Sequence, residues 1–173
     1  MQNFFKRTLK KCCLVFYGRP NTGKSMFAVS LCTFLKGRVV SFANSNSHFW
    51  LTPLVEAKLG LVDDATDAFW HYADTYLRNG LDGNPVSIDR KHKQAVEMNF
   101  PNMLVTTNID VMQDQRWQYL QSRLQCFQFD NVLPFNADNT PVYNLTSAVW
   151  ASFFEKFWES LQLSDQEDGE SET

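Results

Sequence analysis

The sequence predicts an α/β fold, a mainly parallel sheet with helices on both of its faces. Short apolar runs alternate along the chain with longer stretches in which apolar residues recur at helical spacing. The first apolar run ends in a glycine-containing loop, and a stretch with helical spacing begins directly after that loop. Strands that alternate with helices in this way pair in parallel and cover both faces of their sheet with helices.

The expected strands are short and rich in apolar or β-branched residues. They cover residues 13–17, 38–42, 58–62, 103–106 and 124–129. Two further runs, residues 86–88 and 95–98, flank a charged stretch at 89–93. This pattern is typical of a β-hairpin, so we expect a hairpin with a basic apex that projects from the sheet.

The expected helices carry apolar or aromatic residues on one face. They cover residues 24–35, 66–77, 116–122 and 147–161. Gly37 ends the first of them, and the sequence Asp-Gly-Asn-Pro at 82–85 ends the second. The Asn-, Asp- and Pro-rich stretch before residue 147 is expected to be a loop.

Length and composition favour one globular domain. The chain has 173 residues, 44% of them hydrophobic and 20% charged, and no apolar stretch is long enough to span a bilayer. We assign residues 1–163 to the domain and residues 164–173 to an acidic tail. The tail has five acidic residues and no basic or apolar residue, so we expect it to be disordered.

The cysteines and histidines show no metal-ligand spacing. Cys12 and Cys13 are adjacent, Cys32 and Cys126 lie far from them, and the three histidines are scattered. We therefore expect buried free thiols in a reducing compartment, and we expect any metal to arrive with a nucleotide.

The strongest functional signal is the segment GRPNTGKS, which follows the first strand and opens the first helix. It matches G-x-x-x-x-G-K-S, the phosphate-binding loop (P-loop) of nucleoside triphosphatases, in the strand–loop–helix context that the motif requires. Lys24 can reach the β- and γ-phosphates, and the Ser25 hydroxyl can bind Mg²⁺. We expect ATP and Mg²⁺ as cofactors. The loop residues are Gly18, Arg19, Pro20, Asn21, Thr22, Gly23, Lys24 and Ser25.

Polar residues also stand at the ends of two other expected strands. Asp63 and Asp64 follow the strand 58–62, and Asn108 follows the strand 103–106. Alone, the two aspartates could equally form a helix cap or a turn, and an Asn after a strand is usually a turn residue. After a P-loop, the catalytic interpretation prevails, because parallel strands direct their carboxyl ends to one crevice. Asp63 is then expected to hold Mg²⁺ and Asp64 to polarise water.

Four motifs within about a hundred residues resemble the superfamily 3 helicases of small DNA viruses. The segments NTGKS, SFANSNSHFWL, DDAT, YLRNGLDGNPVSIDRKHK and TTNID are similar to those of papillomavirus replication helicases. The resemblance covers residues 10–163. It implies an AAA+-type ATPase that forms a homohexamer around single-stranded DNA, unwinds origin DNA in the 3′-to-5′ direction and acts in the host cell nucleus.

The resemblance also assigns roles to individual residues. Asn108 becomes the sensor of the γ-phosphate, and Arg123 becomes an arginine finger that completes the neighbouring subunit's site. Lys10, Arg78 and Tyr119 are expected to reach across the same interface. Lys91 and His92 at the hairpin apex and Phe49 on the preceding loop are expected to contact DNA, although a basic turn is more often simply solvated.

The resemblance further implies partners: the viral replication and transcription activator, and host replication proteins. Two alternatives remain open: a small P-loop kinase, which would need its own acceptor pocket, and a module that chiefly binds the activator. Proteins of this family have further regions outside the ATPase domain, so the resemblance suggests that this chain is a fragment. Two positions depart from the family pattern: Arg19 replaces a common proline, and Gly80 replaces a common alanine and is expected to loosen a helix end by up to about 1 kcal/mol.

Overall fold

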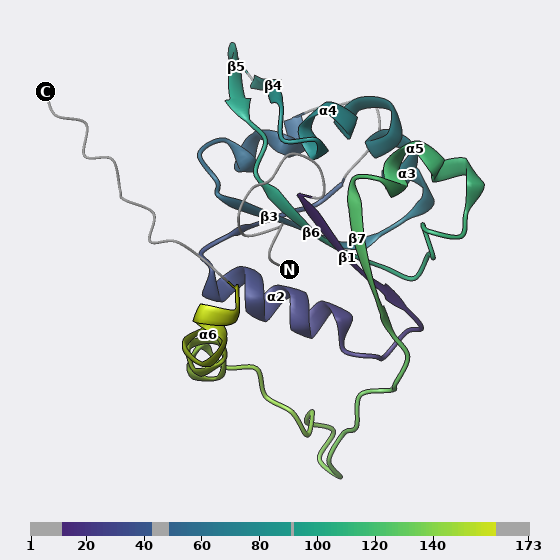
Figure 1. Ribbon diagram of the computed structural model, residues 1–173, viewed down its shortest axis with the longest axis vertical. Helices are drawn as coiled ribbons and strands as arrows, with labels where there is room; N and C mark the ends of the chain where they lie inside the picture. The colour runs from purple at the N-terminus through teal and green to yellow at the C-terminus, as the bar shows by residue number, and fades with distance from the viewer. Residues whose placement is uncertain (1–11, 43–48, 91, 162–173) are drawn as a thin grey trace, which may run out of the picture.

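The computed structural model describes residues 12–42, 49–90 and 92–161 (Figure 1). Its strands are β1 (Cys13–Gly18), β2 (Arg38–Val40), β3 (Leu59–Ala65), β4 (Pro85–Arg90), β5 (Lys93–Asn99), β6 (Asn102–Thr107) and β7 (Leu124–Phe129). Its α-helices are α2 (Lys24–Phe34), α3 (Asp67–Tyr72), α4 (Arg78–Leu81), α5 (Gln118–Gln121) and α6 (Ser147–Leu161). A π-helical turn, η2 (Ala73–Leu77), and two 3-10 helices, η1 (Phe49–Leu54) and η3 (Gln115–Trp117), complete the set.

Five strands form one sheet in the order β2-β3-β6-β1-β7, and every neighbouring pair in it is parallel. This arrangement confirms the predicted fold class. In the pairing of β1 with β7, Cys13 lies opposite Leu124 and Gly18 opposite Phe129. The two strands therefore begin at one edge of the sheet and end together at the other. β4 and β5 pair antiparallel as a separate hairpin, as predicted.

Helices cover both faces of the sheet (Figure 1). Alternate residues of β1 point to opposite faces, so Leu14 and Phe16 join one buried cluster while Cys13 and Val15 join another. The first cluster includes residues of α2 and Trp150 of α6. The second cluster includes η1, α3 and the helical turns near α5. Because both faces are covered, every residue of β1 from Cys13 to Phe16 is buried, which explains its unbroken apolar sequence.

The second predicted helix is longer than expected. α3, η2 and α4 follow one another without a gap from Asp67 to Leu81, whereas the prediction ended at residue 77. Gly80 lies inside this extension and is buried, and a Cβ there would meet the Phe100 ring at 2.7 Å. Gly80 thus allows close packing against Phe100, and the expectation that it loosens a helix end stays a prediction.

Other element boundaries also differ. β2 ends at Val40 instead of residue 42, and β3 extends to Ala65, so Asp63 and Asp64 lie within the strand. The predicted helix at 116–122 is a 3-10 turn followed by one α-helical turn. η1 was not predicted, because its six residues are too few to show helical periodicity.

All four cysteines are free thiols, as predicted. Cys12, Cys13 and Cys32 are buried, while Cys126 is half-buried. Burial raises the pKa of the Cys13 thiol well above its usual value, and raises that of Cys126 to about 12. The thiols of Cys13 and Cys126 are therefore protonated at neutral pH. Among the described residues, no helix is long and apolar enough to cross a membrane.

The position of α6 gives a stability prediction. Trp150 is 5% exposed, packs edge-on against Phe27 with ring centroids 5.2 Å apart, and donates a hydrogen bond to the Ser30 hydroxyl at 3.1 Å. We expect Trp150→Ala to lower the free energy of unfolding by about 3–5 kcal/mol in urea titrations. The neighbouring Val149 is 46% exposed, so Val149→Ala should change it by less than about 0.5 kcal/mol. Equal effects of the two changes would show that α6 is not part of the folded core.

Candidate active site

The P-loop makes a tight turn between β1 and α2. Gly18, Asn21 and Gly23 all have positive φ angles, of 141°, 62° and 83°. A Cβ at Gly18 would lie 2.2 Å from the Phe129 carbonyl oxygen, so only glycine fits where the loop leaves the sheet. α2 begins at Lys24, and its first N–H groups have no partner within the helix. The turn thus places a helix N-terminus, which favours anions, at the end of β1.

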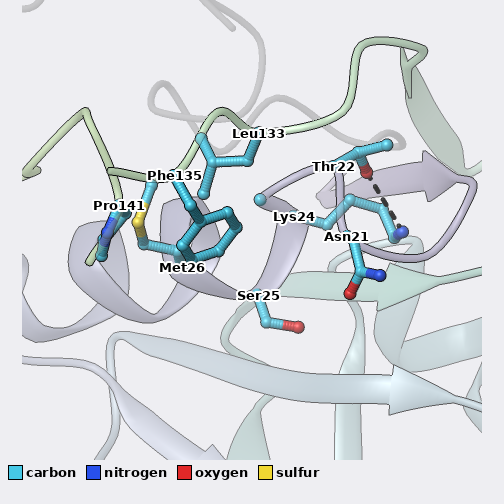
Figure 2. A pocket seen from close by; sticks show the side chains of 9 residues that line it. Asn21, Thr22, Lys24, Ser25, Met26, Leu133, Phe135 and Pro141 are labelled. Carbon is cyan, nitrogen blue, oxygen red and sulfur yellow. Dashed lines mark hydrogen bonds between the residues drawn. The ribbon is translucent and has the colours of Figure 1, made fainter. Parts of the chain in front are cut away.

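Lys24 folds back onto the loop (Figure 2). Its ammonium donates hydrogen bonds to the carbonyl oxygens of Gly18 at 3.0 Å and Arg19 at 2.6 Å, with the Thr22 hydroxyl at 3.4 Å. The side chain is only 7% exposed. Burial lowers the pKa of Lys24, and the charges of Asp64 and Asp63 oppose that effect. Lys24 is thus buried by its own loop and lies within the electrostatic influence of both aspartates.

A cavity of about 370 Å³ adjoins the loop. Asn21 to Met26 line one side of it, and Leu133, Phe135 and Pro141 from the segment after β7 line the other (Figure 2). The Leu133 N–H donates a hydrogen bond to the Asn21 carbonyl oxygen at 2.9 Å, which ties this segment to the P-loop. From the sequence, the segment was expected only to be a loop. The sequence signal that could have indicated this contact is the presence of apolar residues among the Asn, Asp and Pro residues of the loop.

The acidic pair is fixed by one hydroxyl group. Thr106 donates a hydrogen bond to Asp63 Oδ1 at 2.6 Å and accepts one from the Asp64 N–H at 2.7 Å. The pairing of β3 with β6 shifts register between Val62 and Ala65, and Asp64 has a φ of 54°. This bulge leaves both carboxylates exposed at the carboxyl end of β3.

Asn108 is exposed and follows β6 directly. The preceding Thr107 donates a hydrogen bond to the Ala65 carbonyl oxygen at 2.7 Å and accepts bonds from the Trp70 indole at 3.4 Å and the Ile109 N–H at 3.2 Å. The end of β6 is therefore bound firmly to the end of β3. The structure brings the P-loop, Asp63, Asp64 and Asn108 to the same edge of the sheet.

Arg123 lies at the opposite edge, directly before β7. Its guanidinium donates to Asp82 Oδ2 from Nε at 3.0 Å and from Nη2 at 2.7 Å, and it also donates to the carbonyl oxygens of Arg78 and Tyr119. The Arg78 guanidinium in turn lies over the Tyr119 ring, 5.2 Å from its centroid. Three of the expected interface residues therefore form one cluster, whereas Lys10 lies outside the described residues.

The cluster around Arg123 and the P-loop of the same chain lie at opposite ends of β1. Arg123 directly precedes Leu124, which pairs with Cys13 where β1 begins, and the P-loop leaves the sheet where β1 ends at Gly18. At about 3.3 Å per residue, this strand separates the two by about 17 Å. Arg123 is therefore far from the P-loop of its own chain.

The hairpin and η1 enclose a second hollow, of about 540 Å³. Phe49 is 48% exposed and lines it together with Arg90 and Lys93 of the hairpin and Glu56. His92 is exposed at the hairpin turn and has a φ of 58°. The structure thus places Phe49 beside Arg90 and Lys93, the pair next to the hairpin turn, while Lys91 lies outside the described residues.

A parallel five-stranded sheet with a P-loop between β1 and α2 defines the P-loop class of α/β proteins. The model of the papillomavirus helicase family matches residues 1–173, and the chain belongs to this family. It is 58% identical over 168 residues to replication protein E1 of cottontail rabbit papillomavirus and 54% identical over 167 residues to that of human papillomavirus 38. These alignments cover 97% and 96% of the chain, and the chain spans 28% of the length of each relative.

Solved structures share the fold at low sequence identity. A JCV helicase superposes with a TM-score of 0.62 at 22% identity, over 91% of this chain and 43% of that one. The C-terminal region of NrS-1 superposes with a TM-score of 0.57 at 16% identity, over 93% of this chain and 37% of that one. These likenesses support the fold assignment.

The geometry of the P-loop gives a prediction for nucleotide binding. We expect Lys24→Ala to abolish ATP binding, because its ammonium is the cation that the turn of the loop holds. The melting temperature should change little, since Lys24 bonds carbonyls of its own loop. Lys58→Ala, at an exposed position, is the matched control. Titration with a fluorescent ATP analogue measures both, and normal binding by Lys24→Ala would disprove the assignment.

Proposed function

We propose that this chain is the ATPase motor of a DNA helicase, which hydrolyses ATP and moves along single-stranded DNA to unwind the viral origin. One observation carries the proposal: the P-loop, the acidic pair and Asn108, which would hold phosphate and water, stand at one edge of the sheet, and Arg123, which would complete a site, stands at the other. In this proposal, Arg123 of a neighbouring copy of the chain completes each ATPase site. Membership of the papillomavirus helicase family supports DNA as the substrate.

The residues at the active edge fit ATP with Mg²⁺. The exposed Ser25 hydroxyl and the Asp63 carboxylate are hard oxygen ligands, which Mg²⁺ prefers, and Asp63 Oδ2 has no hydrogen bond within the described part of the chain. Mg²⁺ would neutralise charge on the β- and γ-phosphates. Asp64 would orient and polarise the attacking water, and Asn108 would donate a hydrogen bond to the γ-phosphate. The apolar wall of Leu133, Phe135 and Pro141 suits the base.

The hydrogen bonds of Arg123 suit an arginine finger that acts on a neighbour. A guanidinium has five N–H donors, and Arg123 uses Nε, one N–H of Nη1 and one of Nη2 within its own chain. No acceptor for the remaining two N–H groups is found among the described residues. Its side chain is 20% exposed, so this outer edge can meet a partner's γ-phosphate. A homohexameric ring would supply such a partner at every interface.

The hairpin would hold DNA within the ring. Lys91 would bind a phosphate, and His92 and Phe49 would pack against the sugar–phosphate backbone. Phosphate contacts carry no base information, so strands of any sequence should bind. We further propose 3′-to-5′ movement, action in the host cell nucleus, recruitment by the viral replication and transcription activator, and contact with host replication proteins.

Mixed rings test whether Arg123 acts on a neighbour. Uniform rings of Arg123→Ala should bind ATP but lose hydrolysis by about 10³-fold or more. Uniform rings of Lys24→Ala should be equally inactive. Mixing the two variants should restore part of the ATPase activity, because some interfaces then pair an intact Lys24 with an intact Arg123. Asp82→Asn, which weakens the support of Arg123, should likewise be rescued by Lys24→Ala. Absence of recovery in rings shown by native mass spectrometry to be mixed would disprove action across the interface.

Salt dependence tests the hairpin. We expect Lys91→Ala to weaken single-strand binding to all sequences, and to reduce the slope of log affinity against log salt by about 0.7 per lost phosphate contact. His92→Ala should weaken binding with less change in slope. ATPase activity without DNA should survive in both. Lys36→Ala, at an exposed position just after α2, is the control. An unchanged slope in Lys91→Ala would place the DNA elsewhere.

A further inference from the structure

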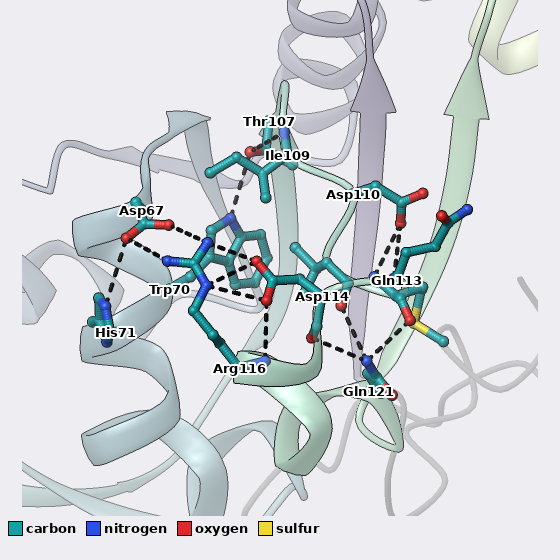
Figure 3. Close-up of polar contacts among 12 residues, drawn as sticks. Asp67, Trp70, His71, Thr107, Ile109, Asp110, Gln113, Asp114, Arg116 and Gln121 are labelled. Atoms are coloured by element: carbon teal, nitrogen blue, oxygen red, sulfur yellow. Dashed lines mark hydrogen bonds and ion pairs between the residues drawn. The ribbon is translucent and has the colours of Figure 1, made fainter.

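The guanidinium of Arg116 is shared by two carboxylates from different segments (Figure 3). It forms one fork with Asp114, with Nε at 3.1 and 3.0 Å from the two oxygens and Nη2 at 2.6 Å from Oδ2. It forms a second fork with Asp67, with Nη2 at 2.9 Å from Oδ1 and Nη1 at 3.2 Å from Oδ2. Asp114 also accepts a hydrogen bond from the Arg116 N–H, which fixes the turn at the start of η3.

The two carboxylates stand on the segments that carry the candidate catalytic groups. Asp67 is the first residue of α3 and lies three positions after Asp64. Asp114 precedes η3 and lies six positions after Asn108. The pair between Arg116 and Asp67 therefore connects the segment that leaves β6 to the segment that leaves β3, beyond the Thr107 hydrogen bonds that join the strand ends.

Other hydrogen bonds order the segment after β6 without reaching α3. The Asp110 carboxylate accepts bonds from the N–H groups of Met112 and Gln113. The Gln121 amide donates to carbonyl oxygens of the same segment, with its shortest bond, of 3.0 Å, to Met112 (Figure 3). Among the ion pairs of the described residues, those between Arg116 and Asp67 are the ones that cross from this segment to α3.

This arrangement suits a role in orienting the two segments more than a role in the stability of the fold. Arg116 and Asp67 are 53% and 47% exposed, and exposed ion pairs contribute little to the free energy of folding. Forked contacts with planar carboxylates, however, restrict both distance and orientation. Trp117, which is 1% exposed, supports the guanidinium, since its ring centroid lies 5.0 Å from Arg116 Cζ. The Trp117 ring is also contacted by His71, whose Nε2 lies 3.5 Å from Asp67 Oδ2.

We propose that Arg116 is a positioning residue of the ATPase site. Through Asp67, it holds the segment that carries Asn108 in place against the end of β3 that carries Asp63 and Asp64. The inference rests on the proposed function, because it requires Asn108 and the acidic pair to act together on the γ-phosphate. It concerns the site within one chain and is independent of Arg123.

The proposal predicts a specific change in ATPase kinetics. Arg116→Gln should lower kcat by roughly tenfold or more while the KM for ATP stays near that of the unmodified chain, because misplacement by 1 Å can cost ~10²-fold in rate while the P-loop still binds ATP. Asp67→Asn should act alike, and the double change should be no worse than either single one, since both remove the same contact. Arg116→Lys, which keeps the charge but loses the fork, should restore only part of kcat.

His71→Ala is the matched control. It removes the other partner of Asp67 and leaves both forks of Arg116 in place, so kcat should stay unchanged. Thermal unfolding is measured for every variant. An Arg116→Gln chain that folds and keeps its kcat would overturn the proposal. Should that variant not fold, Asp67→Asn replaces it in the test, and an unchanged kcat in that chain would overturn the proposal equally.

Mixed rings separate this role from that of the arginine finger. Arg116→Gln should regain activity with Arg123→Ala, which supplies an intact phosphate site, and should gain none with Lys24→Ala. The reverse pattern would overturn the proposal and assign Arg116 to the finger. The mixture of Lys24→Ala with Arg123→Ala is run in parallel. If neither mixture that contains Arg123→Ala recovers, the action of Arg123 across the interface is wrong, while the kinetic test of Arg116 still stands.

Discussion

The parallel pairing of β1 with both β6 and β7 is the constraint on which the other features depend. It sets the register that places Gly18, Thr107 and Phe129 at one edge of the sheet, and it places Cys13 and Leu124 at the other. The P-loop and Asn108 come directly after the strand ends at the first edge, and Arg123 comes directly before the start of β7 at the second. The distance between the P-loop and Arg123 is thus set by the backbone pairing of β1 with β7.

Hydroxyl groups of β6 transmit this constraint to the acidic pair. Thr106 and Thr107 are almost fully buried, and each has its hydroxyl bonded to the end of β3. Buried hydroxyls need partners, because an unsatisfied one costs about 1–3 kcal/mol. The bulge at Asp64 supplies such partners and turns both carboxylates outward. The arrangement of the acidic residues therefore follows from the hydrogen bonds that two buried threonine hydroxyls require.

Local patterns predicted the sheet, because each strand shows an apolar run and the P-loop has a strict spacing. They did not predict the helical extension to Leu81, since its four residues include Asn79 and Gly80, which have low helix propensity. They also missed Leu133, which joins the P-loop through a backbone hydrogen bond that no motif records. Arg123 could be proposed only from family resemblance, and Arg116 was overlooked, because contacts between distant segments determine what an arginine does.

The helical stretch from Asp67 to Leu81 connects the two edges of the domain. Its first residue pairs with Arg116 near the end of β3, and its last turn adjoins Asp82, which pairs with Arg123. At about 1.5 Å per residue, it spans about 22 Å, which is enough to cover the separation of about 17 Å along β1. The same stretch includes Trp70, whose indole donates to Thr107 beside Asn108. One continuous element therefore bonds Thr107, the residue before Asn108, and also Arg123, which donates to the Arg78 carbonyl oxygen.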